Sequence, residues 1–68
     1  MNTTHVWIVL EGERSEGGSV MGVFRTRKRA EDYVTARRPE FVLKFRGEVW
    51  TQYEIGCDFV DVRRHLVG

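Results

Sequence analysis

The sequence predicts an α+β domain: one helix packed on one face of an antiparallel or mixed sheet of four to five strands, in the order β-β-α-β-β-β. Two observations indicate this. Apolar and polar residues alternate in several short segments, which is typical of strands. Residues 27–38 give the one clear example of the three-to-four-residue apolar spacing of a helix. With 68 residues, the chain forms a single domain, residues 1–68, with a small core.

The first predicted strand is residues 5–11, and both of its faces are apolar in the middle. We take Val6, Ile8 and Leu10 as its core face and place Trp7 on the opposite face. A glycine-rich loop, residues 12–18, follows.

Residues 19–24 form the second predicted strand, antiparallel to the first. Val20, Gly22 and Phe24 share one face of it, with Met21 and Val23 on the other. The missing side chain at Gly22 indicates either a gap filled by a neighbouring aromatic ring such as Trp7, or a β-bulge.

The predicted helix begins after Thr26, a residue type that favours the N-cap position, and ends before Pro39. Its inward positions follow the helical repeat and are Ala30, Tyr33, Val34 and Arg37. This apolar stripe is thin for a helix that has to cover a sheet.

Three strands are predicted in the second half, residues 40–46, 48–55 and 59–67. Gly47 joins the first two into a hairpin, and a turn at 56–58 follows. In the first of them, Phe41, Leu43 and Phe45 form a half-buried face, with Val42, Lys44 and Arg46 on the other. The last segment also fits a helix behind an Asp58 cap, but its β-branched residues favour a strand.

Composition excludes several classes of protein. The lone cysteine, Cys57, cannot form an internal disulfide, which favours a reducing, cytoplasmic location. The longest apolar run, residues 6–10, is too short to span a membrane. We expect no metal or cofactor, because metal-ligand spacings and a phosphate-binding loop are both absent. Nothing in the spacing pairs Cys57 with His5 or His65, so we expect no enzyme. Without these stabilising features, a homodimer or another protein partner is expected.

The order of a strand with the sequence VWIVLE, a glycine-containing loop and the segment GVFRTRKRAEDYV is similar to a pattern in small uncharacterised proteins of bacteria and their phages. The similar part covers residues 6–34. The resemblance implies a strand–loop–strand–helix arrangement but no activity. This chain departs from the pattern at Arg27, Lys28 and Arg29, where acidic residues are usual.

Four basic residues gather where the helix is predicted to start: Arg25, Arg27, Lys28 and Arg29. Helix N-termini carry about half a positive charge, so cations are unfavourable there. Pairing of Arg27 with Glu31 and of Lys28 with Asp32 relieves part of this repulsion. The cluster is either a solvated face or a site for an acidic protein surface or nucleic acid, with Arg46 as a further contact.

A second candidate surface is the sheet face that a single helix leaves uncovered. We expect an apolar patch on it made of Trp7, Val9, Val42, Trp50 and Phe59. Such patches mark interfaces, unless arginine stems and the C-terminal segment cover them. Glu48 and Glu54 flank Trp50 and disfavour phosphate, so this face favours a protein partner.

These observations predict a small non-enzymatic protein-interaction module, such as a phage or mobile-element accessory protein or inhibitor that binds a host protein complex in the manner of an anti-CRISPR protein. The alternative is a nucleic-acid-binding protein that uses the basic start of its helix. A structural homodimer is the third possibility.

Overall fold

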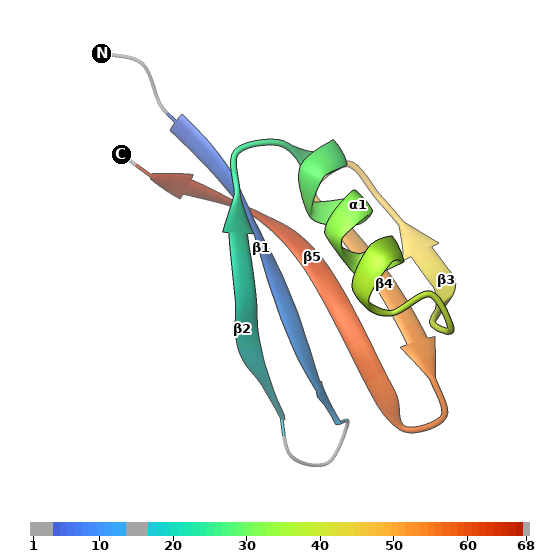
Figure 1. The fold of residues 1–68 in the computed structure, drawn as a ribbon. Coiled ribbons are helices and arrows are strands. Elements are labelled where there is room, and N and C mark those ends of the chain that lie inside the picture. Colours follow the sequence, from blue (N-terminus) through green and yellow to red (C-terminus); the bar gives the residue numbers. More distant parts are fainter. Residues whose placement is uncertain (1–3, 14–16, 68) are drawn as a thin grey trace.

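The computed structural model describes residues 4–13 and 17–67, which form one helix and a five-stranded sheet (Figure 1). The elements are β1 (Thr4–Glu13), β2 (Gly17–Phe24), α1 (Arg27–Arg37), β3 (Val42–Arg46), β4 (Trp50–Ile55) and β5 (Asp58–Val67). Their order across the sheet is β2-β1-β5-β4-β3, and every neighbouring pair is antiparallel. The predicted fold class and element order are confirmed, and the last segment is a strand rather than a helix.

The core lies between α1 and the face formed by β1, β2 and β5. Ala30 and Val34 of the helix are buried there, together with Trp7, Val9, Val60 and Val62 from the sheet. The predicted core face of β1 is therefore wrong, and Val6, Ile8 and Leu10 face away from the helix. Both faces of β1 are apolar, so the sequence pattern of this strand does not indicate which face packs against the helix. Small Ala30 lets the helix approach the sheet closely, and wide Trp7 fills the space beside it.

The helix boundaries follow from its caps. Thr26 is the N-cap, as predicted, and its hydroxyl accepts a hydrogen bond from the Arg29 amide (3.2 Å). At the other end, the Arg38 amide donates to the Val34 carbonyl (2.7 Å). Arg37 was expected to face inward but is exposed, and its guanidinium lies 5.3 Å from the centre of the Tyr33 ring. Burial of an unpaired charge is costly, so this arginine stays at the surface.

A β-bulge interrupts the pairing of β1 with β2. Val9 pairs with Gly22 but Leu10 pairs with Val20, which leaves Met21 as the additional residue. The bulge moves Val20 to the face opposite α1, away from Gly22 and Phe24, and this corrects the predicted alternation. A Cβ atom on Gly22 would lie 2.8 Å from the Phe24 ring. The gap at Gly22 is therefore filled by Phe24 rather than by Trp7.

A second bulge, at Lys44, changes the faces of β3. Leu43 pairs with Tyr53 on the helix side, but Phe45 pairs with Gln52 and Arg46 with Thr51. Phe45 therefore lies on the face opposite α1, and Arg46 lies on the helix side. This is the reverse of the predicted arrangement, because a strict two-residue period cannot anticipate an inserted residue.

All five residues of β3 are exposed, so the predicted half-buried face of this strand is also wrong. The strand lies at the edge of the sheet (Figure 1), whereas α1 packs on β1, β2 and β5. Only Phe41, just before the strand, packs against the core. The hairpin around Gly47 is confirmed by a hydrogen bond from its amide to the Trp50 carbonyl (2.7 Å).

Candidate interaction surfaces

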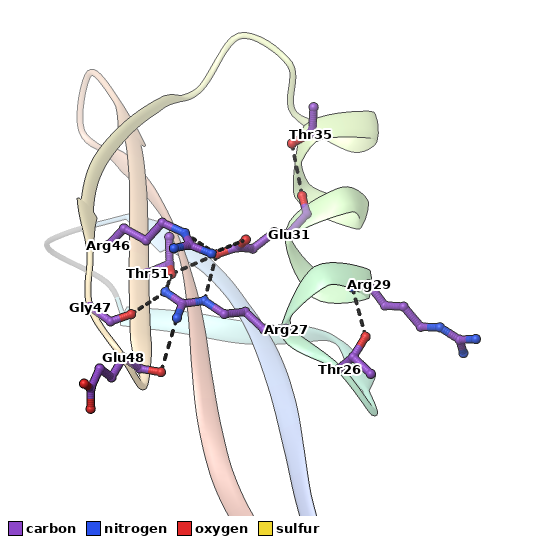
Figure 2. A network of polar contacts seen from close by, with 9 residues as sticks. All are labelled: Thr26, Arg27, Arg29, Glu31, Thr35, Arg46, Gly47, Glu48 and Thr51. Carbon is purple, nitrogen blue, oxygen red and sulfur yellow. Dashed lines mark hydrogen bonds and ion pairs between the residues drawn. The ribbon is translucent and has the colours of Figure 1, made fainter.

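Arg27, in the first turn of α1, points into the protein rather than into solvent (Figure 2). Its Nη1 donates to the Glu48 carbonyl (3.3 Å), and its Nη2 donates to the Gly47 carbonyl and to the Thr51 hydroxyl (2.8 Å). The guanidinium also lies 5.4 Å from the centre of the Trp7 ring. These contacts attach the start of the helix to the β3–β4 hairpin.

Glu31 is the acceptor that links three elements in this network. It lies one helical turn after Arg27 and accepts from its Nε (3.0 Å), from Arg46 of β3 (3.2 and 3.3 Å) and from the Thr51 hydroxyl of β4 (3.1 Å). The bulge in β3 is what brings Arg46 to this side of the sheet. Of the seven predicted partner-binding residues, Arg27 and Arg46 therefore have structural contacts inside the protein, and Trp7 is buried in the core.

Electrostatics agree with this geometry. Burial acts to raise the pKa of Glu31, but hydrogen bonds from Arg46, Arg27 and Thr51 outweigh it and hold that pKa below its ordinary value. A second such carboxylate is Glu11 of β1. The hydrogen bond from Arg38 lowers the pKa of Glu11, and Arg38 Nη2 lies 2.8 Å from Glu11 Oε1. Both carboxylates are charged near neutral pH.

The other members of the basic cluster lie at the surface. Lys28 donates to Asp32 across one helical turn (2.8 Å), and both side chains are exposed. Arg25 and Arg29 are exposed, and neither side chain forms an ion pair with any described residue. Figure 2 shows Arg29 directed away from the network around Arg27. The four charges thus do not form one surface. Of the four, Arg25 and Arg29 are the two without an ion pair to a described residue.

The sheet face opposite α1, called the open face below, is the other predicted surface. Among the described residues, the register places ten apolar residues on it: Val6, Ile8, Leu10, Val20, Val23, Val42, Phe45, Trp50, Phe59 and Val67. Val42, Trp50 and Phe59 were predicted to lie there. Trp7 and Val9 were also predicted there but are buried beneath the helix. Val6, Ile8 and Leu10 had been assigned to the core face. Val20 and Phe45 were missed because each is placed by the bulge in its own strand.

The centre of the open face is held by polar and aromatic contacts. Asp61 of β5 is only 4% exposed; it accepts from Gln52 Nε2 (2.9 Å) and from Arg63 Nη2 (3.2 Å). Arg63 also lies 4.9 Å from the centre of the Trp50 ring, and that ring lies 5.2 Å from the ring of Phe45. Trp50 is partly buried by its contacts with Arg63 and Phe45. The Nε1 of Trp50 has no hydrogen-bond partner among the described residues.

Apolar side chains at the edges of the open face are exposed to solvent. The exposed fraction is 58% for Val20, 57% for Val23, 66% for Val42 and 47% for Phe45. No described element covers them, and Figure 1 shows α1 on the other side of the sheet. Lys44 and Glu54 form an ion pair (3.0 Å) beside Val42. The open face therefore combines an apolar surface with locally balanced charge.

In the described part of the chain, the cysteine and the two histidines do not lie together. Cys57 lies in the turn before β5, whereas His5 and His65 lie at the far end of the β1–β5 pair. Among the described residues there is no group of three His, Cys, Asp or Glu side chains placed to hold a metal ion. Across the same part of the chain, no helix is long and apolar enough to cross a membrane.

Comparisons with protein-family models, curated proteins and solved structures return no match. The resemblance drawn from residues 6–34 stays a prediction.

Proposed function

We propose that the protein is a non-enzymatic protein-interaction module and that its partner docks on the open face. The observation that carries the proposal is the exposure of Val20, Val23, Val42 and Phe45 on a sheet face that no described element covers. Exposed apolar surface around a rigid aromatic centre is typical of protein interfaces. The ion pairs Arg63–Asp61 and Lys44–Glu54 leave this face without a strong charge of either sign, which favours an apolar protein surface over nucleic acid.

Two neighbouring residues of β3 provide a matched test. Val42 lies on the open face and Leu43 on the helix side, and both are exposed. We expect a Val42→Lys bait to lose proteins that the original chain retains from a lysate of the source organism or its host, and a Leu43→Lys bait to keep them. Equal retention by the two baits would contradict docking on the open face.

A second copy of the chain is one partner that the same face accommodates. Light scattering at micromolar concentration gives the mass in solution. A mass of two chains that falls to one chain with Val42→Lys, but not with Leu43→Lys, would identify the homodimer as the occupant. A monomer at all concentrations would exclude it.

Nucleic-acid binding is the second candidate, favoured by Arg25 and Arg29, which are exposed and have no ion pair with a described residue. Arg27 and Arg46 have internal partners, so fewer cations are free for phosphate than the cluster suggests. Binding of labelled DNA or RNA should weaken steeply with salt, with a log–log slope of about −0.7 to −0.9 per phosphate contacted. Loss of binding in the Arg25→Ala/Arg29→Ala variant would support this function. No shift at about 50 mM salt would exclude it.

For the biological role, we propose a phage or mobile-element accessory protein that inhibits a host protein complex. Its support is the small size of the chain and the resemblance of residues 6–34 to bacterial and phage proteins. In the affinity experiment above, recovery of subunits of one host defence complex by the original bait and by Leu43→Lys would support this role. Recovery of unrelated housekeeping proteins would contradict it.

A further inference from the structure

A cleft of about 860 Å³ opens on the helix side of the sheet, beside the C-terminal end of α1. The ends of β1 and β4 and the starts of β2 and β5 lie at this end of the sheet, away from the first residues of β1 and the last of β5 (Figure 1). Three apolar side chains, Met21, Phe41 and Ile55, line the cleft. Its volume lies within the range of about 300–1,000 Å³ that is usual for ligand sites.

Acidic side chains surround this apolar lining. Glu13, Glu40 and Asp58 line the cleft and are exposed, and none forms a hydrogen bond or ion pair with a described side chain. The remaining charges, Glu11 and Arg38, are paired with each other across the cleft wall. Glu40 interacts with Arg38 at longer range, whereas Glu13 and Asp58 have no cationic partner among the described residues. The cleft thus has an acidic rim around an apolar surface.

The opposite end of α1 carries positive charge. The start of α1 carries Arg25 and Arg29, exposed and without acidic partners among the described residues, and the first turn of the helix has no acidic residue. The cleft lies at the other end of the helix. A cationic ligand is therefore attracted to the cleft and repelled from the start of the helix, whereas an anionic ligand is repelled by the carboxylates of the cleft.

We propose that the cleft binds a basic segment of another protein: one large apolar side chain on Met21, Phe41 and Ile55, flanked by lysines or arginines that pair with Glu13, Glu40 and Asp58. Charge complementarity selects the partner, and the apolar lining supplies contact area that a free cation cannot use. This site is separate from the open face, so it adds a second surface to the proposed interaction module. The protein then bridges two partners, or two parts of one partner.

The test uses a fluorescein-labelled peptide with arginines on both sides of one central leucine. Fluorescence anisotropy at about 150 mM salt, where distant charges are screened, measures its Kd. We expect Glu13→Lys and Glu40→Lys each to weaken binding about three- to tenfold, as expected for reversal of a contacting charge. Glu13→Gln serves if the lysine variant does not fold. Glu48→Lys is the matched control, because Glu48 is an exposed acid in the β3–β4 turn, and it should leave Kd within about twofold.

The apolar half of the site is tested with the same peptide. Replacement of its leucine by glycine, or Ile55→Gln in the protein, should weaken binding, whereas Leu43→Gln, an exposed apolar residue outside the cleft, should not. Equal weakening by Glu13→Lys and Glu48→Lys, or unchanged binding of the glycine peptide, would overturn the proposal. Val42→Lys should leave peptide binding intact, because Val42 lies on the open face. The proposal for the cleft and the proposal for the open face can therefore be contradicted separately.

Discussion

At the residue scale, Glu31 is the side chain on which the attachment of helix to hairpin depends most. It accepts hydrogen bonds from Arg27, Arg46 and Thr51, which belong to three different elements. Arg27 is mostly withdrawn from solvent, with 19% of its side chain exposed. Removal of the carboxylate charge therefore leaves a partly buried guanidinium without its counter-charge.

We predict that Glu31→Gln lowers the free energy of unfolding by about 1–3 kcal/mol, because hydrogen bonds to charged groups are worth more than neutral ones. Urea denaturation monitored by circular dichroism measures the change. Asp32→Asn is the matched control: Asp32 is the next residue, its pair with Lys28 is exposed, and its loss should cost less than about 0.5 kcal/mol. Equal effects of the two substitutions would contradict the role given to Glu31.

The same carboxylate makes stability depend on pH. The pKa of Glu31 is lower in the folded protein than its ordinary value of 4.5, so the folded state binds this proton less readily than the unfolded state. Its contribution is therefore full above about pH 4.5 and is lost as the pH falls toward the folded pKa. Urea midpoints at about pH 7 and about pH 3 should differ less for Glu31→Gln than for the original chain. The pKa of Glu11 is also lowered in the folded protein, so the stability of Glu31→Gln should still fall somewhat at acid pH. An identical pH dependence of the two proteins would contradict this account.

At the element scale, the start of α1 is destabilised by its own charges. Its first turn holds no acidic residue, and Arg29 has no ion pair with a described residue to offset the helix dipole. We predict that Arg29→Glu raises the free energy of unfolding by about 0.3–1 kcal/mol. Arg37→Glu is the control, because Arg37 lies in the last turn, where the same charge change should destabilise the helix by a similar amount. Urea denaturation of both variants at low salt measures the two changes. A loss of stability in Arg29→Glu would show that Arg29 has a structural partner.

The elements also show what the sequence could and could not predict. Thr26, Ala30 and Val34 predicted the start and buried face of the helix, because capping and helical spacing are local properties. The faces of β2 and β3 could not be predicted, because each bulge depends on the strand beside it and reverses every later side chain. The pairing of Arg27 with Glu31 was expected from spacing, but the contact of Arg46 with Glu31 joins distant segments through the second bulge. The uncovered face was expected because one helix cannot cover five strands, yet two of its five predicted residues lie in the core.

At the scale of the whole molecule, the two faces of the sheet differ in what covers them. The helix side carries the core, the network around Glu31 and the cleft beside the end of α1. The open face keeps exposed apolar residues that the network around Glu31 does not reach. If these residues serve an interface rather than the fold, polar replacement should have little effect on stability. Threonine is the suitable substitute for valine, since the two have similar shape and strand preference.

We predict that Val23→Thr and Val42→Thr change the free energy of unfolding by less than about 0.5 kcal/mol, as is usual for surface positions. Val62→Thr should lower it by about 1–3 kcal/mol, because Val62 is fully buried and its replacement places a hydroxyl in an apolar core. Urea denaturation of the three variants at low protein concentration, where self-association is minimal, makes the comparison. If the substitutions at Val23 and Val42 cost as much as that at Val62, the open face contributes to the stability of the isolated chain, and its exposed residues need no partner to explain them.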